Sequence, residues 1–475
     1  MKEKFKFKYI LWAAVVIQII VDAFVIGKLI KMNVVPTLYF VIIICCLIAV
    51  NLLTFLSTKR LWTGIVMLII SLILSGVMIY GLDVLNKADS AVNDVSQDSD
   101  KQVTEMVIVV LNDSEAQEIS DLKEFTVGYL NDSDIEASQN MLDQIKEAAG
   151  DISTAEFTGI TEAVNALYDK TINALVMNKA YIAVVSELDG YSDFEQRTKQ
   201  IFSSEIVRYI NIVPEKETNL DAFVVYFTGI DTFGGVTATS RSDVNILAVI
   251  NTKTRHIQLI NTPRDYYVEL PNSGGAKDKL THAGIYGVDN SIGALEMLYG
   301  VDVDYYVRIN FSGFEEIIDA LGGIDVYSEY DFTVEPIKHY TVGINHLSGI
   351  EALAFARERY SFAEGDVQRG KNQMAVITAL IQQLSSPEIL YNYTSVLDSI
   401  SQSFQTNMQS DTIYSLVKRA LSSTSGWTVD SYSVAGNGSY EETYSIPGMQ
   451  VYVMEPNVSD VEEAKSKIEA VLNEN

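Results

Sequence analysis

The sequence predicts an α/β protein in three parts: a three-helix membrane anchor, a small α/β accessory domain and a larger α/β domain. Three observations support this. Three long apolar runs open the chain, apolar β-rich runs then alternate with helix-like patterns, and acidic residues are concentrated after the apolar runs. With 475 residues, the chain has room for two or three domains and a sizeable core.

The charges are segregated along the chain. Residues 1–82 hold 8 of the 34 Lys and Arg residues but only 2 of the 62 Asp and Glu residues, so this head carries +6 and the remainder −34. Such an acidic remainder repels polyphosphate, which argues against general nucleic-acid binding. Cys45 and Cys46 are adjacent within an apolar run, so they provide neither a disulfide framework nor a zinc site.

The apolar runs Tyr9–Ile30, Pro36–Ser57 and Leu61–Leu82 are each long enough, as helices, to cross a hydrocarbon core of about 30 Å. The distribution of basic residues predicts a cytoplasmic N-terminus and places residues 83–475 outside the membrane. A long outer region without cysteine is typical of a bacterial surface of the Gram-positive type. For Asp22, packing toward the other spans beside Gln18 is the simpler interpretation, and an intramembrane functional acid is the alternative.

The outer chain begins with residues 83–103, which are polar and acidic and predict a linker. In residues 104–215, the β-rich runs MVIVVL, FTVGYL and KAYIAVVS alternate with helical spacing over Ile135–Ala149 and Ile160–Leu175. This pattern indicates a compact α/β domain. Because the segment has no histidine, cysteine or glycine-rich loop, we expect a spacer or partner-binding module rather than a second enzyme.

Residues 220–475 form the larger predicted domain. Expected strands are Ala222–Gly229, Val244–Ile250, His256–Asn261 and Val303–Ile309. Expected helices are Ser291–Tyr299, Phe311–Leu321, Gly349–Arg357, Val367–Leu384, Asp411–Leu421 and Asp460–Leu472.

Arginines are concentrated in this larger domain. Seven of the eleven in the chain lie between residues 241 and 369: Arg241, Arg255, Arg264, Arg308, Arg357, Arg359 and Arg369. Guanidinium is always charged and matches phosphate oxygens in bidentate fashion, so the concentration predicts a specific anion site. Pairing with the abundant surface carboxylates is the alternative.

The arginines occur in motif-like contexts at expected strand and helix ends. Asp231 ends one strand, and Arg241 and Asp243 begin the next, so both carboxylates can lie at neighbouring strand ends. Two such carboxylates suit Mg²⁺ (or Mn²⁺) held together with substrate phosphate. Pro263 turns Arg264 out of the sheet.

Further candidates lie along the rest of the domain. Lys279 adds a cation, Arg357 and Arg359 close a helix, and Arg369 and Gln373 share a helix face. His282 is either an acid/base group or, more simply, a structural histidine. The chain has no GxxxxGK[ST] motif, no GxGxxG after a strand and no GxSxG elbow, so neither a standard nucleotide site nor a hydrolase triad is supported.

Seven ordered segments carry a family resemblance. They are FTGIDTFGG (227–235), SRSDVNIL (240–247), NTPRDYYV (261–268), DKLTHAGIYG (278–287), INFSGFEEIIDALGGIDV (309–326), LSGIEALAFARERY (347–360) and DVQRGKNQ (366–373). In this order they resemble the LytR-CpsA-Psr (LCP) family, closely over about residues 220–390. Three spans followed by an accessory domain resemble its capsule-type members.

The resemblance implies a central mixed sheet flanked by helices, and transfer of a glycan from a polyprenyl-pyrophosphate carrier onto peptidoglycan. The residues implied to bind pyrophosphate are Arg241, Arg264, Lys279, Arg357, Arg359, Arg369 and Gln373. Asp231 and Asp243 are implied to serve the metal, with Asp231, Arg241, Arg264, Asp265 and Arg369 as the catalytic set. Asn372 and Glu351 depart from the family pattern, in which many members have Arg and Gln respectively.

We therefore expect a membrane-anchored glycopolymer phosphotransferase, most simply one that attaches capsular polysaccharide to peptidoglycan, with other capsule biosynthesis proteins as further expected partners. A pyrophosphate in transit needs a metal and arginines to stabilise its transition state. The base is either Asp231 or Asp265. Two alternatives stay open: a non-catalytic regulator or assembly factor of capsule synthesis, and a polyprenyl-pyrophosphate phosphatase.

Overall fold

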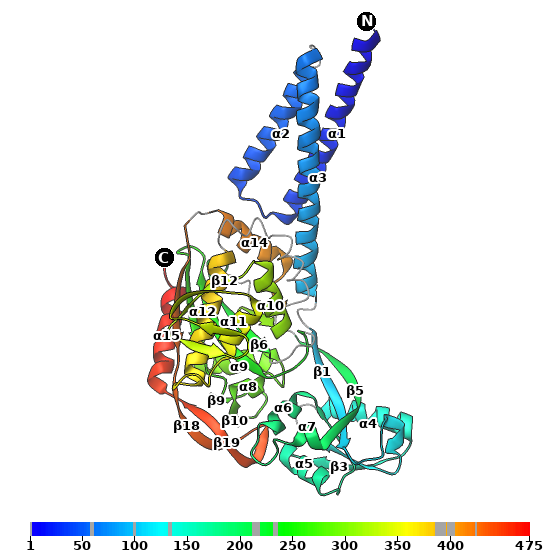
Figure 1. Ribbon diagram of the computed structural model, residues 1–475, viewed down its shortest axis with the longest axis vertical. Helices are drawn as coiled ribbons and strands as arrows, with labels where there is room; N and C mark the ends of the chain where they lie inside the picture. Colours follow the sequence, from blue (N-terminus) through cyan, green and yellow to red (C-terminus); the bar gives the residue numbers. More distant parts are fainter. Residues whose placement is uncertain are drawn as a thin grey trace. The chain divides into compact units, whose positions relative to one another are not determined.

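The computed structural model describes residues 2–57, 61–97, 101–131, 135–210, 219–230, 236–384, 396, 404–422 and 425–475 (Figure 1). The chain divides into two compact units. The first comprises Met1–Gln97, Leu390–Ser401 and Met408–Gly426, and the second comprises Asp98–Ile389, Gln402–Asn407 and Trp427–Asn475.

The first unit contains three long apolar helices in mutual contact, which confirms the three expected apolar helices. They are α1 (Lys2–Met32), α2 (Thr37–Ser57) and α3 (Leu61–Gln97). Their few polar side chains pair with one another, since Asn51 donates a hydrogen bond to Asp22 (2.7 Å) and Ser71 to Gln18. Asp22 and Gln18 are buried among the helices, in agreement with the simpler interpretation of Asp22.

The predicted linker 83–103 is wrong for most of its length. Helix α3 continues to Gln97, and the first strand begins at Lys101. The extension persists because α14 (Ser410–Leu421) packs on it: the Tyr414 hydroxyl donates to Asp89 (2.6 Å) and Ser410 to Asn93 (2.8 Å). A partner some 300 residues away in sequence cannot be anticipated from local composition.

In the second unit, residues 101–209 build a five-stranded sheet with the order β3-β2-β4-β1-β5. Its strands are β1 (Lys101–Leu111), β2 (Thr126–Leu130), β3 (Ser153–Phe157), β4 (Ala174–Asn178) and β5 (Thr198–Tyr209). Helix α4 (Ile135–Ala149) covers one face. The other face carries α5 (Ile160–Tyr168), α6 (Ala180–Ser186) and α7 (Phe194–Arg197).

One expected strand in this region is a helix. The run KAYIAVVS (179–186) contains α6, and the strand is the preceding segment ALVMN, part of which was expected to end a helix. A short apolar run does not reveal its period. In the fold, all five residues of β4 are buried between two helix layers, whereas α6 buries Tyr181, Val184 and Val185 along one side.

The larger part of the second unit contains a six-stranded mixed sheet with the order β16-β11-β6-β7-β8-β17, as the resemblance implies. The strands are β6 (Ala222–Ile230), β7 (Ser242–Asn251), β8 (His256–Asn261), β11 (Tyr305–Ile309), β16 (Phe404–Thr406) and β17 (Thr428–Ser433). The β6–β11 and β8–β17 pairs are parallel, and the other pairs are antiparallel.

Helices cover both faces of this sheet because alternate strand residues are apolar on each side. Leu247 and Val249 pack with α9 (Val288–Tyr299) and α15 (Val458–Leu472). Ile246 and Ala248 face Met374 of α12 (Asp366–Leu384). Helix α12 also contacts α11 (Gly349–Arg357), which packs on α10 (Phe311–Ala320).

Short antiparallel pairs surround the six-stranded sheet. They are β9 (Tyr267–Glu269) with β10 (Lys277–Lys279), β12 (Ile324–Ser328) with β15 (Gly343–Leu347), β13 (Phe332–Val334) with β14 (Lys338–Tyr340), and β18 (Gly436–Thr443) with β19 (Ile446–Pro456). Ile446, Val451 and Val453 of β19 share a buried apolar cluster with Val164 and Val184. The accessory region and the larger α/β region therefore share a core.

Candidate active site

Antiparallel pairing of β7 and β8 brings two separate motifs together. Ile246 pairs with Asn261, so three residues further along the register Asp243 faces Arg264. Arg264 Nη1 donates to Asp243 Oδ1 at 2.9 Å. The Thr281 hydroxyl donates to the same oxygen at 3.1 Å.

Arg241 precedes β7 and is only 5% exposed. Its Nη1 lies 2.7 Å from Oε1 of Glu187, which follows α6 in the accessory region. The second oxygen of Glu187 lies 3.5 Å from Arg264 Nη2. Sequence reasoning missed Glu187, because no local motif marks it and only the packing of α6 carries it to the arginines.

Asp265 lies between two cations. Its carboxylate is 3.2 Å from Lys279 Nζ and 3.8 Å from Arg264 Nε. Lys279 ends β10 and directly precedes the single-turn helix α8 (Leu280–Ala283). The Thr281 backbone N–H donates to the Arg264 carbonyl (2.8 Å), which fixes α8 against this loop.

Helix α12 contributes Arg369, whose Nη2 lies 2.6 Å from Asp366 Oδ1 one turn earlier. Gly370 allows this helix to approach the end of β8, since a Cβ there would meet Asn261 Nδ2 at 2.1 Å. The charge of Arg369 acts on the ionisation of Asp243. The charges of Arg369 and Asp243 both act on the ionisation of Asp366.

These eight residues form what we call the arginine cluster: Arg241, Arg264, Lys279 and Arg369 with Glu187, Asp243, Asp265 and Asp366. The four cations and four carboxylates balance. Burial opposes ionisation of Asp243, but Arg264, Arg241 and Arg369 outweigh it and hold its pKa well below the usual range. The pKa of Glu187 is likewise lowered by Arg241 and Arg264 against the effect of burial.

Asp366 and Arg369 differ from the rest of the cluster. Burial raises the pKa of Asp366 despite the nearby Arg369, and burial lowers the pKa of Arg369 despite Asp366. For this pair, the effect of burial therefore exceeds that of the partner charge.

The other residues predicted to bind pyrophosphate lie outside the arginine cluster as defined above. Gln373 is buried one turn after Arg369 on α12. Arg357 is exposed, and its guanidinium lies 4.3 Å from the Phe311 ring centroid. Arg359 donates to the Tyr360 hydroxyl (2.8 Å), and its charge acts on Arg369.

The two departures from the family pattern have structural roles. Asn372 is buried, accepts a hydrogen bond from Gln368 (3.0 Å) and donates to the Phe355 carbonyl (3.3 Å). Glu351 closes the capping box of α11 with Ser348 and accepts from Lys338 (3.0 Å). Neither side chain belongs to the arginine cluster.

Asp231, predicted as a metal ligand and catalytic residue, lies outside the described residues. Among those the structure does describe, no three His, Cys, Asp or Glu side chains could hold a metal on their own. Asp243 is the one predicted metal ligand that the structure describes, and magnesium sites that include substrate phosphate use one or two protein carboxylates.

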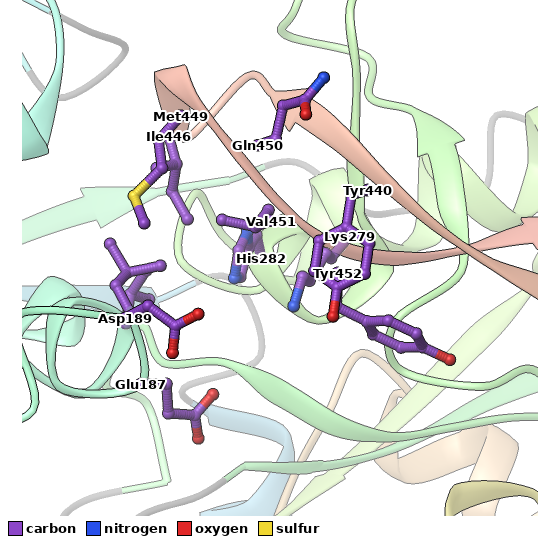
Figure 2. A pocket seen from close by; sticks show the side chains of 12 residues that line it. Glu187, Asp189, Lys279, His282, Tyr440, Ile446, Met449, Gln450, Val451 and Tyr452 are labelled. Atoms are coloured by element: carbon purple, nitrogen blue, oxygen red, sulfur yellow. The ribbon is translucent and has the colours of Figure 1, made fainter.

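A pocket of about 240 Å³ borders the cluster (Figure 2). Glu187 and Lys279 belong to both. The rest of the wall comes from the end of α6, from His282 of α8, and from β18 and β19, and includes Asp189, Tyr440, Met449, Gln450 and Tyr452. The accessory region and the larger region thus build this pocket together.

Comparison with known proteins identifies the family of the chain. The sequence model of the LytR_cpsA_psr family matches residues 184–466, which is more than half of the chain. The chain belongs to the LytR_cpsA_psr family. The match begins in α6 and includes Glu187 and every residue of the arginine cluster. A second model, DNA polymerase processivity factor, matches residues 58–177, about a quarter of the chain, and assigns no family.

Curated relatives of this LytR_cpsA_psr member carry transferase names. The polyisoprenyl-teichoic acid–peptidoglycan teichoic acid transferase TagU of Bacillus cereus is 36% identical over 179 residues, 38% of this chain and 58% of its own length. TagT of Bacillus subtilis, with the same transferase name, is 34% identical over 207 residues, 41% of this chain and 63% of its own length. The chain thus spans about six tenths of the length of these relatives.

Solved structures also align with it. B. subtilis TagV is 26% identical, with a TM-score of 0.46 over 54% of this chain and 100% of that one. TagT bound to LI-WTA is 28% identical, with a TM-score of 0.45 over 55% of this chain and 95% of that one.

Proposed function

We propose that this protein is a glycopolymer transferase that moves a glycan from a polyprenyl-pyrophosphate carrier to peptidoglycan. The observation that carries the proposal is the arginine cluster, in which three buried arginines, one just before β7, one after β8 and one on α12, lie around Asp243. Buried guanidinium groups are costly unless they bind an anion, and phosphate oxygens match their fork. The transferase names of the relatives support the same reaction class.

In this proposal, Arg241, Arg264, Arg369 and Lys279 bind the pyrophosphate, with Arg357, Arg359 and Gln373 as further contacts. A pyrophosphate entering a cluster of balanced charge brings excess negative charge. Mg²⁺ or Mn²⁺, held by Asp243 and the predicted Asp231, would offset that charge and stabilise the leaving phosphate. The arginines orient the phosphorus and hold charge as it develops.

The nature of the glycan is a finer part of the proposal. The three apolar helices and the accessory region support a capsule-type member, so we propose capsular polysaccharide as the glycan. The curated relatives are named for teichoic acid. Wall polymer analysis of a strain that lacks this protein distinguishes capsular polysaccharide from teichoic acid, because only the glycan that the protein transfers should be lost from the wall.

The membrane arrangement is proposed from the same helices. We place the N-terminus in the cytoplasm and the second unit outside, where a membrane-bound carrier and peptidoglycan are both within reach. Reporter fusions after Ser57 and at Asn475 test it: an alkaline phosphatase reporter at Asn475 should be active and one after Ser57 inactive. The reverse pattern would contradict the arrangement.

The activity is tested with the full-length protein in nanodiscs. The assay contains a polyprenyl-pyrophosphate-linked oligosaccharide, Mg²⁺ and purified peptidoglycan strands, and mass spectrometry follows both polyprenyl phosphate and the glycan. We expect a joined glycan–peptidoglycan product that disappears with EDTA and in Arg369→Ala. Carrier cleavage without joining would indicate a phosphatase, and tight carrier binding without turnover would indicate a regulator.

A further inference from the structure

A buried histidine borders the pocket beside the arginine cluster, and the reaction as proposed so far does not use it. His282 is 4% exposed, and its Nδ1 lies 2.7 Å from Asp278 Oδ1. The other oxygen of Asp278 accepts hydrogen bonds from the Ser445 backbone N–H (2.8 Å) and the Ser445 hydroxyl. Asp278 is therefore fully buried with both oxygens engaged, and it fixes the orientation of the imidazole.

Fixing Nδ1 leaves the other ring nitrogen available. Within the described part of the chain, the imidazole's hydrogen bond is the one at Nδ1. His282 is among the residues that line the pocket (Figure 2), and with Nδ1 engaged by Asp278, Nε2 is the ring nitrogen left for a further hydrogen bond. A histidine oriented by a buried carboxylate on one nitrogen, with the other directed to a cavity, has the arrangement of a general base.

The same helical turn joins this histidine to the arginine cluster. In α8, Thr281 donates to Asp243, while the next residue, His282, lines the pocket. Lys279, just before the turn, both pairs with Asp265 and lines the pocket. A molecule in the pocket is thus next to the cluster that is proposed to hold the reacting phosphorus.

The rest of the pocket wall suits a carbohydrate. Tyr440 and Tyr452 are 64% and 41% exposed, and their rings meet edge to face with centroids 6.0 Å apart. Gln450 and Asp189 add hydrogen-bonding groups. Aromatic faces beside a few polar groups provide both apolar contact and orientation for a sugar, and the volume admits one sugar residue rather than a polymer.

We propose that this pocket binds a sugar of the acceptor glycan and that His282 is the general base for its hydroxyl. The inference rests on the proposed transferase function. The acceptor oxygen forms a bond to the phosphorus that carries the glycan, and the bond from that phosphorus to the bridging oxygen breaks. The hydroxyl proton passes to His282 Nε2, polyprenyl phosphate leaves with the bridging oxygen, and the proton later returns to solvent.

Asp265, expected from the sequence as one candidate base, is less suited. One of its oxygens lies 3.2 Å from Lys279 and the other 3.8 Å from Arg264, so each oxygen is already beside a cation. Among the described residues, His282 instead pairs with the buried carboxylate of Asp278, which orients its ring. The charged and titratable groups facing His282 are Asp278, Lys279, Glu187, Asp189, Tyr440 and Tyr452.

The test compares full-length His282→Gln with wild type in the nanodisc assay. We expect kcat to fall about 10²- to 10³-fold, with the Kd for a polyprenyl-pyrophosphate-linked oligosaccharide within twofold of wild type. The acidic limb of the kcat/KM pH profile should disappear. Matched control His346→Gln removes an exposed histidine that pairs with Asp325 at 2.8 Å, and it should retain wild-type turnover.

Imidazole rescue separates a base from a structural role. In His282→Ala, added imidazole should raise turnover at least tenfold, because the enlarged pocket can admit it. Wild-type turnover and pH profile in His282→Gln, or a folded His282→Ala that imidazole does not rescue, would overturn the assignment. If wild type itself forms no joined product, the proposed function fails instead.

The acceptor pocket is tested independently with Tyr452→Ala. We expect KM for peptidoglycan strands to rise about five- to tenfold while carrier Kd stays unchanged. Tyr327→Ala, at an exposed tyrosine of β12 that does not line this pocket, is the control. An unchanged KM in Tyr452→Ala, or an equal rise in both variants, would overturn the pocket as the acceptor site.

Discussion

The Glu187 carboxylate lies 2.7 Å from the guanidinium of Arg241 and 3.5 Å from that of Arg264. It comes from the accessory region, which was expected to be a spacer or a partner-binding module. In the proposed reaction, it would compete with a phosphate oxygen for these two arginines. The accessory region therefore contributes directly to the charge balance of the candidate active site.

Glu187→Gln should bind the pyrophosphate carrier more tightly. Removing one competing negative charge leaves Arg241 and Arg264 less compensated, and we expect carrier Kd to fall roughly tenfold, equivalent to about 1.4 kcal/mol. Equilibrium binding of a fluorescent carrier analogue in nanodiscs measures it. Glu115→Gln, an exposed position in the accessory region, is the control, and weaker binding in Glu187→Gln would show that Glu187 assists the substrate instead.

Arg264→Ala should abolish transfer and destabilise the substrate-free protein. Loss of this guanidinium removes the nearest cation from Asp243, whose side chain is 18% exposed, so the cost should lie below the about 3–5 kcal/mol of breaking a fully buried pair. Arg264→Lys should recover part of the stability but little turnover, because an ammonium cannot replace the fork. Arg255→Ala, where the guanidinium stacks on Trp427, serves as control, and equal activity losses in both would argue against a specific role.

The protein should lose stability as the pH falls. The pKa values of Asp243 and Glu187 are lower in the fold than in the unfolded chain, where ordinary carboxyl values near 4 apply. The unfolded state then binds more protons, so their stabilisation is complete above about pH 5 and is lost on acidification. Asp366, with its raised pKa, acts in the opposite direction.

Thermal unfolding of the full-length protein between pH 3 and pH 7 measures this dependence. Wild type should show a steep fall in Tm below about pH 5, and Glu187→Gln a shallower one, because one of the two linked carboxyls is gone. Glu115→Gln should follow wild type. Parallel curves for wild type and Glu187→Gln would contradict the linkage.

Gly370→Ala should impair activity more than its size suggests. The added Cβ would lie 2.1 Å from Asn261 Nδ2, so either the Asn261 side chain or α12, which carries Arg369, must shift. We expect a loss of about 10²-fold in turnover, as for small misplacements of positioning groups. Gly426→Ala is the control, because its added Cβ would have no atom within 4 Å, and its turnover should equal that of wild type. Normal turnover in Gly370→Ala would show that the close approach of α12 to β8 is not required for activity.

Much of the fold could be predicted because its signals are local. The expected strands near 222, 244 and 256 and helices such as α10, α11 and α12 agree with the structure to within a few residues. Strong hydrophobic periodicity and capping fix such elements without reference to the rest of the chain. The predictions were wrong where local signals are insufficient. These places are α6 and β4, whose apolar runs are short, and the end of α3, which is stabilised by a distant segment.

Composition and hydrophobic periodicity were enough to predict the three apolar helices, the α/β class and the set of arginines, because they encode burial and charge directly. Which side chains meet depends on how the chain folds. The β7–β8 register sets Arg264 opposite Asp243, the packing of α6 delivers Glu187, and the β18–β19 hairpin completes a pocket in front of His282. Those contacts join residues far apart in the chain, and long-range packing leaves no local pattern from which they could be read.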